Sequence, residues 1–395
     1  MAQDKDPKTL NVPPLRFPGF TDEWKLDKLE NLVTIKSGIS PNCISNEGEL
    51  PYYKVEQLNN CVVTLSETPY FAHTSSNNII PFGSIIFPKR GAAIMTNKVR
   101  ISKFDCVLDT NLMALITNRK VNNRFLYYFI LRYKLGRIAD TSTIPQINNV
   151  HINPIKMRFP SVEEQMKISN FLAILDERIA TQNKIIEDYK SVISSIMKKV
   201  FFNDDWHTVK LGDICDRVKR KNTKNESTLV LTIAAQHGLV NQTDFFNKSV
   251  ASENLSNYFL LKKGDFAYNK SYSGDYTWGA IKRLDLYDAG VLSPLYICFR
   301  PKADFVDSDF LTYYFESKCW YREVAEICVE GARNHGLLNV SVTDFFNLQL
   351  HIPSLNEQKE ISKMMKTFMV KMAECQRLLS LYTEQKQFLL QKMFI

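Results

Sequence analysis

The chain has 395 residues, 45% of them hydrophobic, which is enough apolar material for two cores of ordinary domain size. Its net charge of +8 suggests a polyanionic partner, with nucleic acid mildly favoured over a membrane surface. The eight cysteines form no C-x-x-C pair and no apolar leader or 18-residue apolar run is found, so we expect a reducing cytoplasm with no zinc site, disulfide frame, export signal or membrane span.

A polar, proline-rich tail (1–20) precedes a first globular region, residues 21–160. This region mixes short β-rich runs such as SIIFP with one aromatic helix, RFLYYFILRYKLG. The aromatic residues of FLYYF recur at helical spacing, which is more typical of core packing than of a platform for stacking bases. We therefore predict a mixed α/β domain here.

A long helix is predicted at residues 161–203, because Ile168, Leu172, Leu175 and Ile179 begin a seam with alternating steps of four and three. Ser161 with Glu164 has the spacing of a capping box. The seam continues through Gln182 and is typical of a coiled coil.

The chain then repeats itself. A second globular region (204–352) again combines β-rich runs with an aromatic helix, and a second long helix (353–395) aligns without a gap on the first from Pro160 and Pro353 onward, with ten identical positions. Its seam is interrupted at Lys386. The expected fold is α+β, with two pseudo-repeated globules joined by two long helices. If the helices form an antiparallel coiled coil, Gln182 lies close to Cys375.

Polar, basic stretches follow a strand at matching places in both halves, Phe87–Arg100 and Tyr268–Leu284, and further polar stretches precede each long helix, Thr141–Ile152 and Glu330–Val342. Lys and Arg can contact phosphates there, while Asn and Ser can contact base edges. A solvated hairpin loop explains any single residue equally well, but the matching placement favours a binding role for the segments. The candidate nucleic-acid contacts are Lys89, Arg90, Asn97, Lys98, Thr141, Ser142, Thr143, Gln146, Asn148, Asn269, Lys270, Ser271, Tyr276, Lys282, Arg333, Asn334 and Asn339.

Motifs for catalysis are missing from the sequence: there is no G-x-x-x-x-G-K-[ST], G-x-G-x-x-G, H-E-x-x-H or G-x-S-x-G. The segment at Asn153 lacks the second proline and the aromatic residue of an N-P-P-F amino-methyltransferase motif. The six histidines are scattered, so neither a metal cluster nor a catalytic triad can be read from them. We expect no catalytic residue, no metal and no cofactor bound by this chain.

Four motifs together resemble those of the specificity subunit of bacterial type I restriction-modification systems. They are LRFPGFTDEW, the strand pattern G-[DS]-[IF]-x-x-x-K, TSTIPQIN, and P-S-x-x-E-Q-x-x-I-S at the start of a long helix. The resemblance implies target-recognition domains at 21–160 and 204–352, each reading half of a bipartite double-stranded DNA site. The helices at 161–203 and 353–395 would be conserved spacers in an antiparallel coiled coil.

The same resemblance implies protein partners. Two methyltransferase subunits would dock on the coiled coil and use S-adenosylmethionine to methylate adenine N6, and two restriction subunits would cleave and translocate DNA with ATP and Mg. One departure is that GARNHGLLN in the second half replaces TSTIPQIN.

Two other functions remain possible from the residues. A stand-alone methyltransferase or nuclease with a diverged active site would bind S-adenosylmethionine or cut DNA unaided. A coiled-coil scaffold that binds only protein would show no salt-dependent affinity for DNA.

Overall fold

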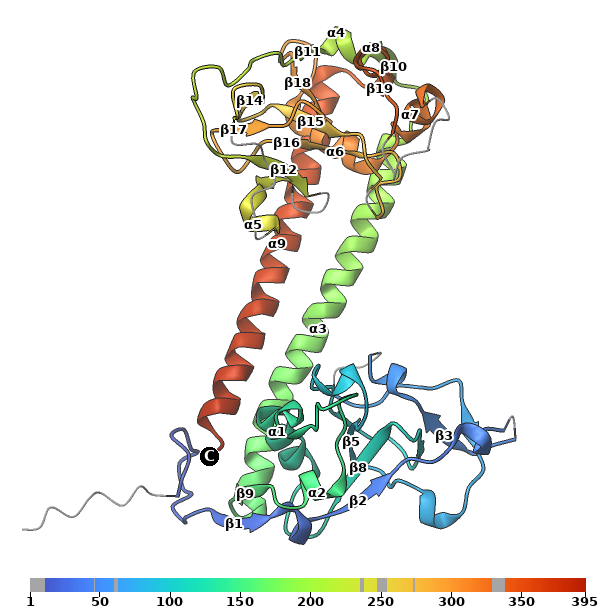
Figure 1. Ribbon diagram of the computed structural model, residues 1–395, viewed down its shortest axis with the longest axis vertical. Coiled ribbons are helices and arrows are strands. Elements are labelled where there is room, and N and C mark those ends of the chain that lie inside the picture. Colours follow the sequence, from blue (N-terminus) through green and yellow to red (C-terminus); the bar gives the residue numbers. More distant parts are fainter. Residues whose placement is uncertain are drawn as a thin grey trace, which may run out of the picture. The chain divides into compact units, whose positions relative to one another are not determined.

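The computed structural model describes residues 11–45, 47–59, 63–234, 238–246, 254–272, 274–328 and 338–395. The chain divides into two compact units. The first unit is Met1–Ile185 with Cys375–Ile395, and the second unit is Ile186–Glu374. Both long helices, α3 (Val162–Phe201) and α9 (Leu355–Lys392), contribute to each unit (Figure 1). Each unit thus contains one globule, the first part of one long helix and the last part of the other.

The first unit contains a sheet in the order β2-β8-β5-β6, a smaller sheet β4-β3-β7 and the antiparallel pair β1–β9. Its strands are β1 (Lys25–Lys28), β2 (Val33–Ser37), β3 (Leu50–Tyr53), β4 (Phe71–Ala72), β5 (Ile85–Pro88), β6 (Arg100–Ile101), β7 (Val107–Leu108), β8 (Leu112–Thr117) and β9 (Lys156–Phe159). Its helices besides the long ones are α1 (Asn123–Tyr133) and α2 (Asn149–Ile152), with 3-10 turns at Leu29–Asn31, Pro41–Cys43, Val55–Asn59, Ser76–Asn78, Ala92–Ile94 and Leu135–Ile138.

The second unit contains a sheet in the order β11-β18-β15-β16 and the antiparallel pairs β10–β19, β12–β13 and β14–β17. Its strands are β10 (His207–Lys210), β11 (Cys215–Arg217), β12 (Leu231–Ala234), β13 (Gly238–Asn241), β14 (Phe259–Lys262), β15 (Phe266–Asn269), β16 (Ala280–Arg283), β17 (Ala289–Leu292), β18 (Ile297–Pro301) and β19 (Gln349–Ile352). Its shorter helices are α4 (Leu211–Ile214), α5 (Gln242–Phe246), α6 (Ser308–Ser317), α7 (Tyr321–Ile327) and α8 (Val342–Phe346).

The predicted repeat is confirmed by the strand order of the main sheets. In β2-β8-β5-β6 and in β11-β18-β15-β16, the strand carrying the matched glycine–lysine pattern is third, and it pairs antiparallel with both neighbours. The turn before that strand requires glycine in both units, because Gly83 has φ 80° and Gly264 has φ 87°. An α+β fold built from two copies of one domain is therefore observed.

Each aromatic helix packs into the core of its own unit, as predicted. On α1, the side chains from Phe125 to Phe129 are buried, and on α6 so are Phe310 and Phe315. The end of a long helix completes each core: Phe394 stacks on Phe125 with ring centroids 4.8 Å apart, and Phe201 packs on Phe310 at 5.6 Å. These aromatic residues therefore hold the folded domains together and are not available for stacking bases.

The seam of the long helices is also confirmed. In the first unit, Ile168, Leu172 and Leu175 of α3 share a core cluster with Leu389 and Leu390 of α9. Gln182 Nε2 donates to the carbonyl oxygen of Cys375 at 3.1 Å, as expected for antiparallel helices. None of the helices in the described ranges is long and apolar enough to cross a membrane.

The two long helices start differently, although both have the Ser-x-x-Glu spacing. The capping box of α9 is complete, because the Ser354 amide donates to the Glu357 carboxylate at 3.1 Å and the Glu357 amide donates to Ser354 Oγ at 3.5 Å. The Ser354 hydroxyl also donates to the Glu357 carboxylate, at 2.7 Å, and this bond together with the bond from the Ser354 amide lowers the pKa of Glu357. The expected box of α3 is only half formed: Glu164 donates its amide to Ser161 Oγ, but Arg16 binds its carboxylate through two hydrogen bonds of 2.7 and 2.8 Å. The start of α3 thereby anchors the segment that precedes β1.

Candidate nucleic-acid interface

In the first unit, two stretches that are far apart in the sequence lie side by side at the end of β5. The carbonyl oxygen of Lys89 accepts a hydrogen bond of 2.8 Å from the amide of Ile147, and the amide of Gly91 donates to Pro145 at the same distance. The structure thus brings together the two stretches that the sequence singled out in this half. We call the contact between residues 89–91 and 145–147 the first junction.

The second unit repeats this contact at the end of β15. The carbonyl oxygen of Lys270 accepts a hydrogen bond of 2.8 Å from the amide of Leu338, and Lys270 Nζ lies 3.4 Å from the carbonyl oxygen of Val340. Lys270 follows Gly264 as Lys89 follows Gly83, six positions along the matched pattern. The contact between residues 269–271 and 338–340 is therefore the counterpart of the first junction, and we call it the second junction.

The loop beside the first junction presents a short row of exposed polar side chains. Asp140 and Gln146 exchange two backbone hydrogen bonds of 2.9 Å, which closes residues 141–145 into a tight loop. The side chains at its tip, Thr141 to Thr143 and Ile144, are exposed, with Ile144 62% exposed. Hydroxyl groups can exchange hydrogen bonds with base edges, and an apolar side chain can contact a thymine methyl group. The tip of this loop thus carries three exposed hydroxyl groups and one exposed apolar side chain.

Charges around the first junction are unevenly exposed. Arg90 is exposed, while Lys89 is half-buried, and desolvation followed by repulsion from Arg90 lowers the pKa of Lys89. The Ser142 amide donates to the Asp140 carboxylate at 2.9 Å, and this bond lowers the pKa of Asp140. The exposed guanidinium of Arg90 is therefore the group best placed to attract a phosphate here.

Two further candidate DNA contacts of the first half, Asn97 and Lys98, form hydrogen bonds within the unit. Asn97 has φ 50°, its Nδ2 donates to the Leu131 carbonyl oxygen at 2.9 Å, and its Oδ1 is buried. Lys98 Nζ donates to the side chain of Asn59. By contrast, Asn148 is exposed, and its amide donates to His151 Nδ1 at 3.1 Å. Gln146 is half-buried. The exposed candidates of this half thus cluster at the junction and its loop.

In the second half, Lys282 and Tyr276 form an internal cluster with Glu316. The Lys282 side chain is only 9% exposed and forms an ion pair with Glu316, and the Tyr276 hydroxyl donates to the same carboxylate at 3.0 Å. Burial raises the pKa of Tyr276. Because Glu316 neutralises its charge inside the unit, we do not assign Lys282 to a phosphate contact.

The remaining candidates of the second half divide into two groups. Asn269, Lys270 and Ser271 are half-buried at the second junction, and Asn339 is exposed beside them. Arg333 and Asn334 lie outside the described residues. The second junction thus presents the same kinds of groups as the first, an amide and a lysine beside a backbone contact.

Sequence reasoning overlooked a basic run at the edge of the second main sheet. Five of the residues from 217 to 224 are Lys or Arg, so the signal was present in the sequence. Of these, Arg217 and Lys219 are exposed at β11 and beyond it, whereas Arg220 pairs with the buried carboxylate of Asp265. Arg217 and Lys219 are further candidates for phosphate contacts.

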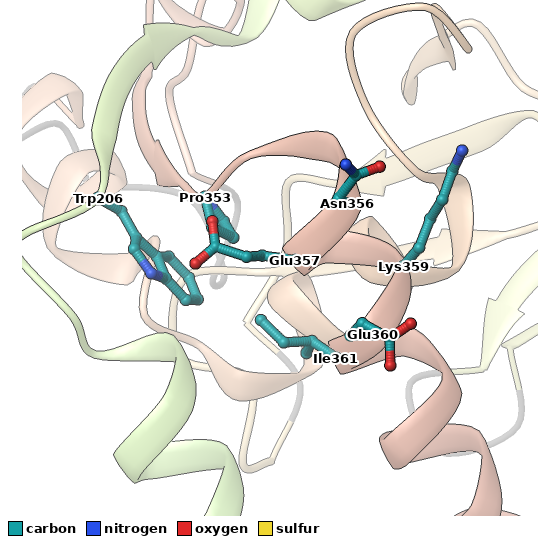
Figure 2. Close-up of a pocket in the computed structure, with 7 residues that line it drawn as sticks. All are labelled: Trp206, Pro353, Asn356, Glu357, Lys359, Glu360 and Ile361. Atoms are coloured by element: carbon teal, nitrogen blue, oxygen red, sulfur yellow. The ribbon is translucent and has the colours of Figure 1, made fainter.

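A pocket of about 450 Å³ at the start of α9 has a different character (Figure 2). Figure 2 shows Glu357 extending toward Trp206 and Pro353, with Glu360 one helical turn further along. Two carboxylates and one ammonium group, that of Lys359, line the pocket. This charge balance does not favour a phosphate, and the groups at its entrance already serve to cap α9.

Comparisons with known proteins agree over both halves. Residues 21–189 and 203–377 each match the family model of the type I restriction modification DNA specificity domain. The type I restriction enzyme MjaVIII specificity subunit of Methanocaldococcus jannaschii is 21% identical over 385 residues, covering 89% of this chain and 87% of the relative.

Solved structures show the same fold. The S subunit of a type I restriction-modification system from M. genitalium superposes with a TM-score of 0.60 at 17% identity, covering 97% of this chain and 99% of that one. A chain from a structural study of complex assembly and conformational transition in the type I system superposes with a TM-score of 0.55 at 16% identity, covering 94% and 97% of the two chains.

Proposed function

We propose a role for each unit from the family to which the chain belongs, that of the type I restriction-modification DNA specificity proteins. Each of the two units reads one half of a bipartite double-stranded DNA site. Recognition of a DNA target is the role of the family. The observation that carries the division into two halves is the repeated junction, in which the carbonyl oxygens of Lys89 and Lys270 accept equivalent 2.8 Å bonds. Each unit thereby has its own junction beside its own core.

Within each junction we assign different roles to charged and neutral groups. Arg90, Lys89 and Lys270 attract phosphates and position the unit on the duplex. The exposed hydroxyls of residues 141–143 and the amides of Asn148 and Asn339 contact base edges. The two units carry different side chains at these places, as is required if they read different half-sites.

We further propose that the long helices bind the other subunits of a type I complex. Exposed apolar side chains on α3 and α9 support a protein partner there, because water-exposed apolar surface on a helix favours association. In the first unit they are Met166, Ile174, Leu378, Leu381 and Phe388, and in the second Val192, Met364 and Val370. Two methyltransferase subunits using S-adenosylmethionine and two restriction subunits using ATP and Mg are the expected partners.

DNA binding by the purified chain tests the assignment of the phosphate contacts. Arg90→Ala and Lys270→Ala should each weaken binding by a similar factor on every sequence, and each should reduce the slope of log affinity against log salt by about one. Lys282→Met is the matched control, because this lysine is already paired with Glu316 and its loss should leave the salt slope unchanged. Titrations at several salt concentrations measure the slopes. If the purified chain showed no salt-dependent affinity for DNA, a scaffold that binds only protein would be favoured instead.

The isolated chain should neither methylate nor cleave DNA and should not hydrolyse ATP. The physical reason is the lack of a phosphate-binding loop or an amino-methyltransferase motif in its sequence. Incubating the purified chain with DNA, labelled S-adenosylmethionine and ATP measures all three activities. Transfer of the label to DNA without any partner subunit would contradict the assignment.

A further inference from the structure

A buried charged cluster lies between α3 and α9 in the first unit. Asp176 of α3 is 5% exposed, and the side chain of Lys386 of α9 is 14% exposed. Lys386 forms an ion pair with one oxygen of the Asp176 carboxylate, and the Tyr128 hydroxyl donates to the other at 2.6 Å. The Lys386 ammonium also lies 5.7 Å from the centre of the Tyr128 ring. Both charges are thus fully partnered, and the interruption of the seam at Lys386 is explained.

The repeat places apolar residues at the equivalent positions of the second unit. With Pro160 aligned on Pro353, the counterpart of Asp176 is Met369 and the counterpart of Lys386 is Ile193. Ile193 and Met369 line one groove of the second unit, together with Met365. The equivalent helix crossing is therefore ionic in one unit and apolar in the other, where Ile193 is 7% exposed and Met369 38% exposed.

This difference has a consequence for which helices can pair. If two copies of the first half paired with each other, Asp176 would face Ile193 at both crossings. If two copies of the second half paired, Lys386 would face Met369 at both. In a pair of first halves Asp176 keeps its bond to Tyr128 but loses the lysine, and in a pair of second halves Lys386 loses the carboxylate. Loss of the opposite charge at a largely buried position is unfavourable, whereas pairing a first half with a second half leaves no such mismatch.

We propose that the ion pair between Asp176 and Lys386 is a pairing code that makes the first half of the chain associate with a second half and reject a copy of itself. Such a code would prevent a wrong association during synthesis, because the first half leaves the ribosome before the second half exists and can meet other first halves. The neighbouring bond between Gln182 and Cys375 cannot discriminate in this way, since these two positions are counterparts of each other in the repeat.

The test uses the full-length chain with a protease site inserted at the exposed residues Asp204 and Asp205, between α3 and β10. The folded protein is cleaved, unfolded in denaturant and refolded, and native mass spectrometry then counts the three possible pairs of halves. In the original sequence, pairs of identical halves should be disfavoured by roughly a hundredfold or more for each mismatched crossing, and so should be undetectable. In Asp176→Met/Lys386→Ile, where both crossings become apolar, pairs of identical halves should appear in substantial amounts.

Glu177→Met is the matched control, because it makes a comparable change at the exposed neighbouring position and should still exclude identical pairs. If the apolar double variant does not refold, the reversed pair Asp176→Lys/Lys386→Asp provides the second measurement. Its first half should pair with its own second half and reject the second half of the original chain. Identical pairs forming in statistical proportion in the original sequence, or a reversed first half that accepts the original second half, would overturn the proposal.

Discussion

Replacing residues 21–160 with the equivalent segment of another family member should change one half of the recognised DNA motif and leave the other half intact. The reason is that the core cluster around Phe125 and the cluster around Phe310 share no residue, and each unit has its own junction. The half that changes should be replaced completely, because phosphate contacts, loop and base contacts move together. Sequencing the methylated sites of cells carrying the exchanged chain and a methyltransferase partner measures the motif.

The design of the exchange follows from the contacts that cross its boundaries within the first unit. Tyr128 and Phe125 should be kept in the grafted segment, since they contact Asp176 and Phe394 on the retained helices. The reciprocal exchange of residues 206–352 is the control and should change the opposite half. A motif altered in both halves by one exchange would contradict independent reading.

Phe394→Ala should destabilise the first unit by about 3–5 kcal/mol, the range typical of removing a buried aromatic ring. Phe394 is 1% exposed, stacks on Phe125 and meets the edge of Trp24, with ring centroids 6.4 Å apart, so its loss leaves a cavity in the core. Hydrogen exchange followed by mass spectrometry should show faster exchange in β1, β9 and α1. Chemical denaturation of the whole chain gives the change in free energy.

Phe388→Ala is the matched control, since this ring lies on α9 six residues before Phe394 but is 55% exposed. It should change the free energy of unfolding by no more than about 0.5 kcal/mol, as is usual for surface positions. Equal losses of stability for the two variants would mean that Phe394, just after α9, does not complete the core of the first unit.

Periodicity and local spacing were sufficient to predict both long helices, their seam and, for an antiparallel arrangement, the proximity of Gln182 to Cys375. These features depend on residues close in sequence or on a repeat that is visible in the sequence. The capture of Glu164 by Arg16 was not predictable from the Ser-x-x-Glu spacing, because a carboxylate at a helix start can bond to its own backbone or to a distant guanidinium. Only the path of the chain decides between them.

In the candidate interface, too, sequence patterns locate the segments, but they do not show which side chains are free to bind. The stretches around Lys89 and Lys270 were found because glycine, strand and lysine recur at fixed spacing. Whether one lysine in such a stretch is free depends on its neighbours in three dimensions: Lys282 is neutralised by Glu316 on α6, a residue that no local pattern connects to it. Likewise, the sequence shows Lys386 only as a charged residue that interrupts the apolar seam, and the structure shows that it pairs with Asp176.

We expect the two units of this chain to read two halves of one DNA site, and a map of the methylated bases shows whether they do. A host that carries this chain together with a methyltransferase partner is sequenced by a method that detects adenine methylation, next to the same host without the chain. The expected motif has two specified parts separated by unspecified base pairs and contains a methylated adenine. This methylation should occur only when the chain is present. A single continuous motif, or methylation that is unchanged when the chain is removed, would contradict it.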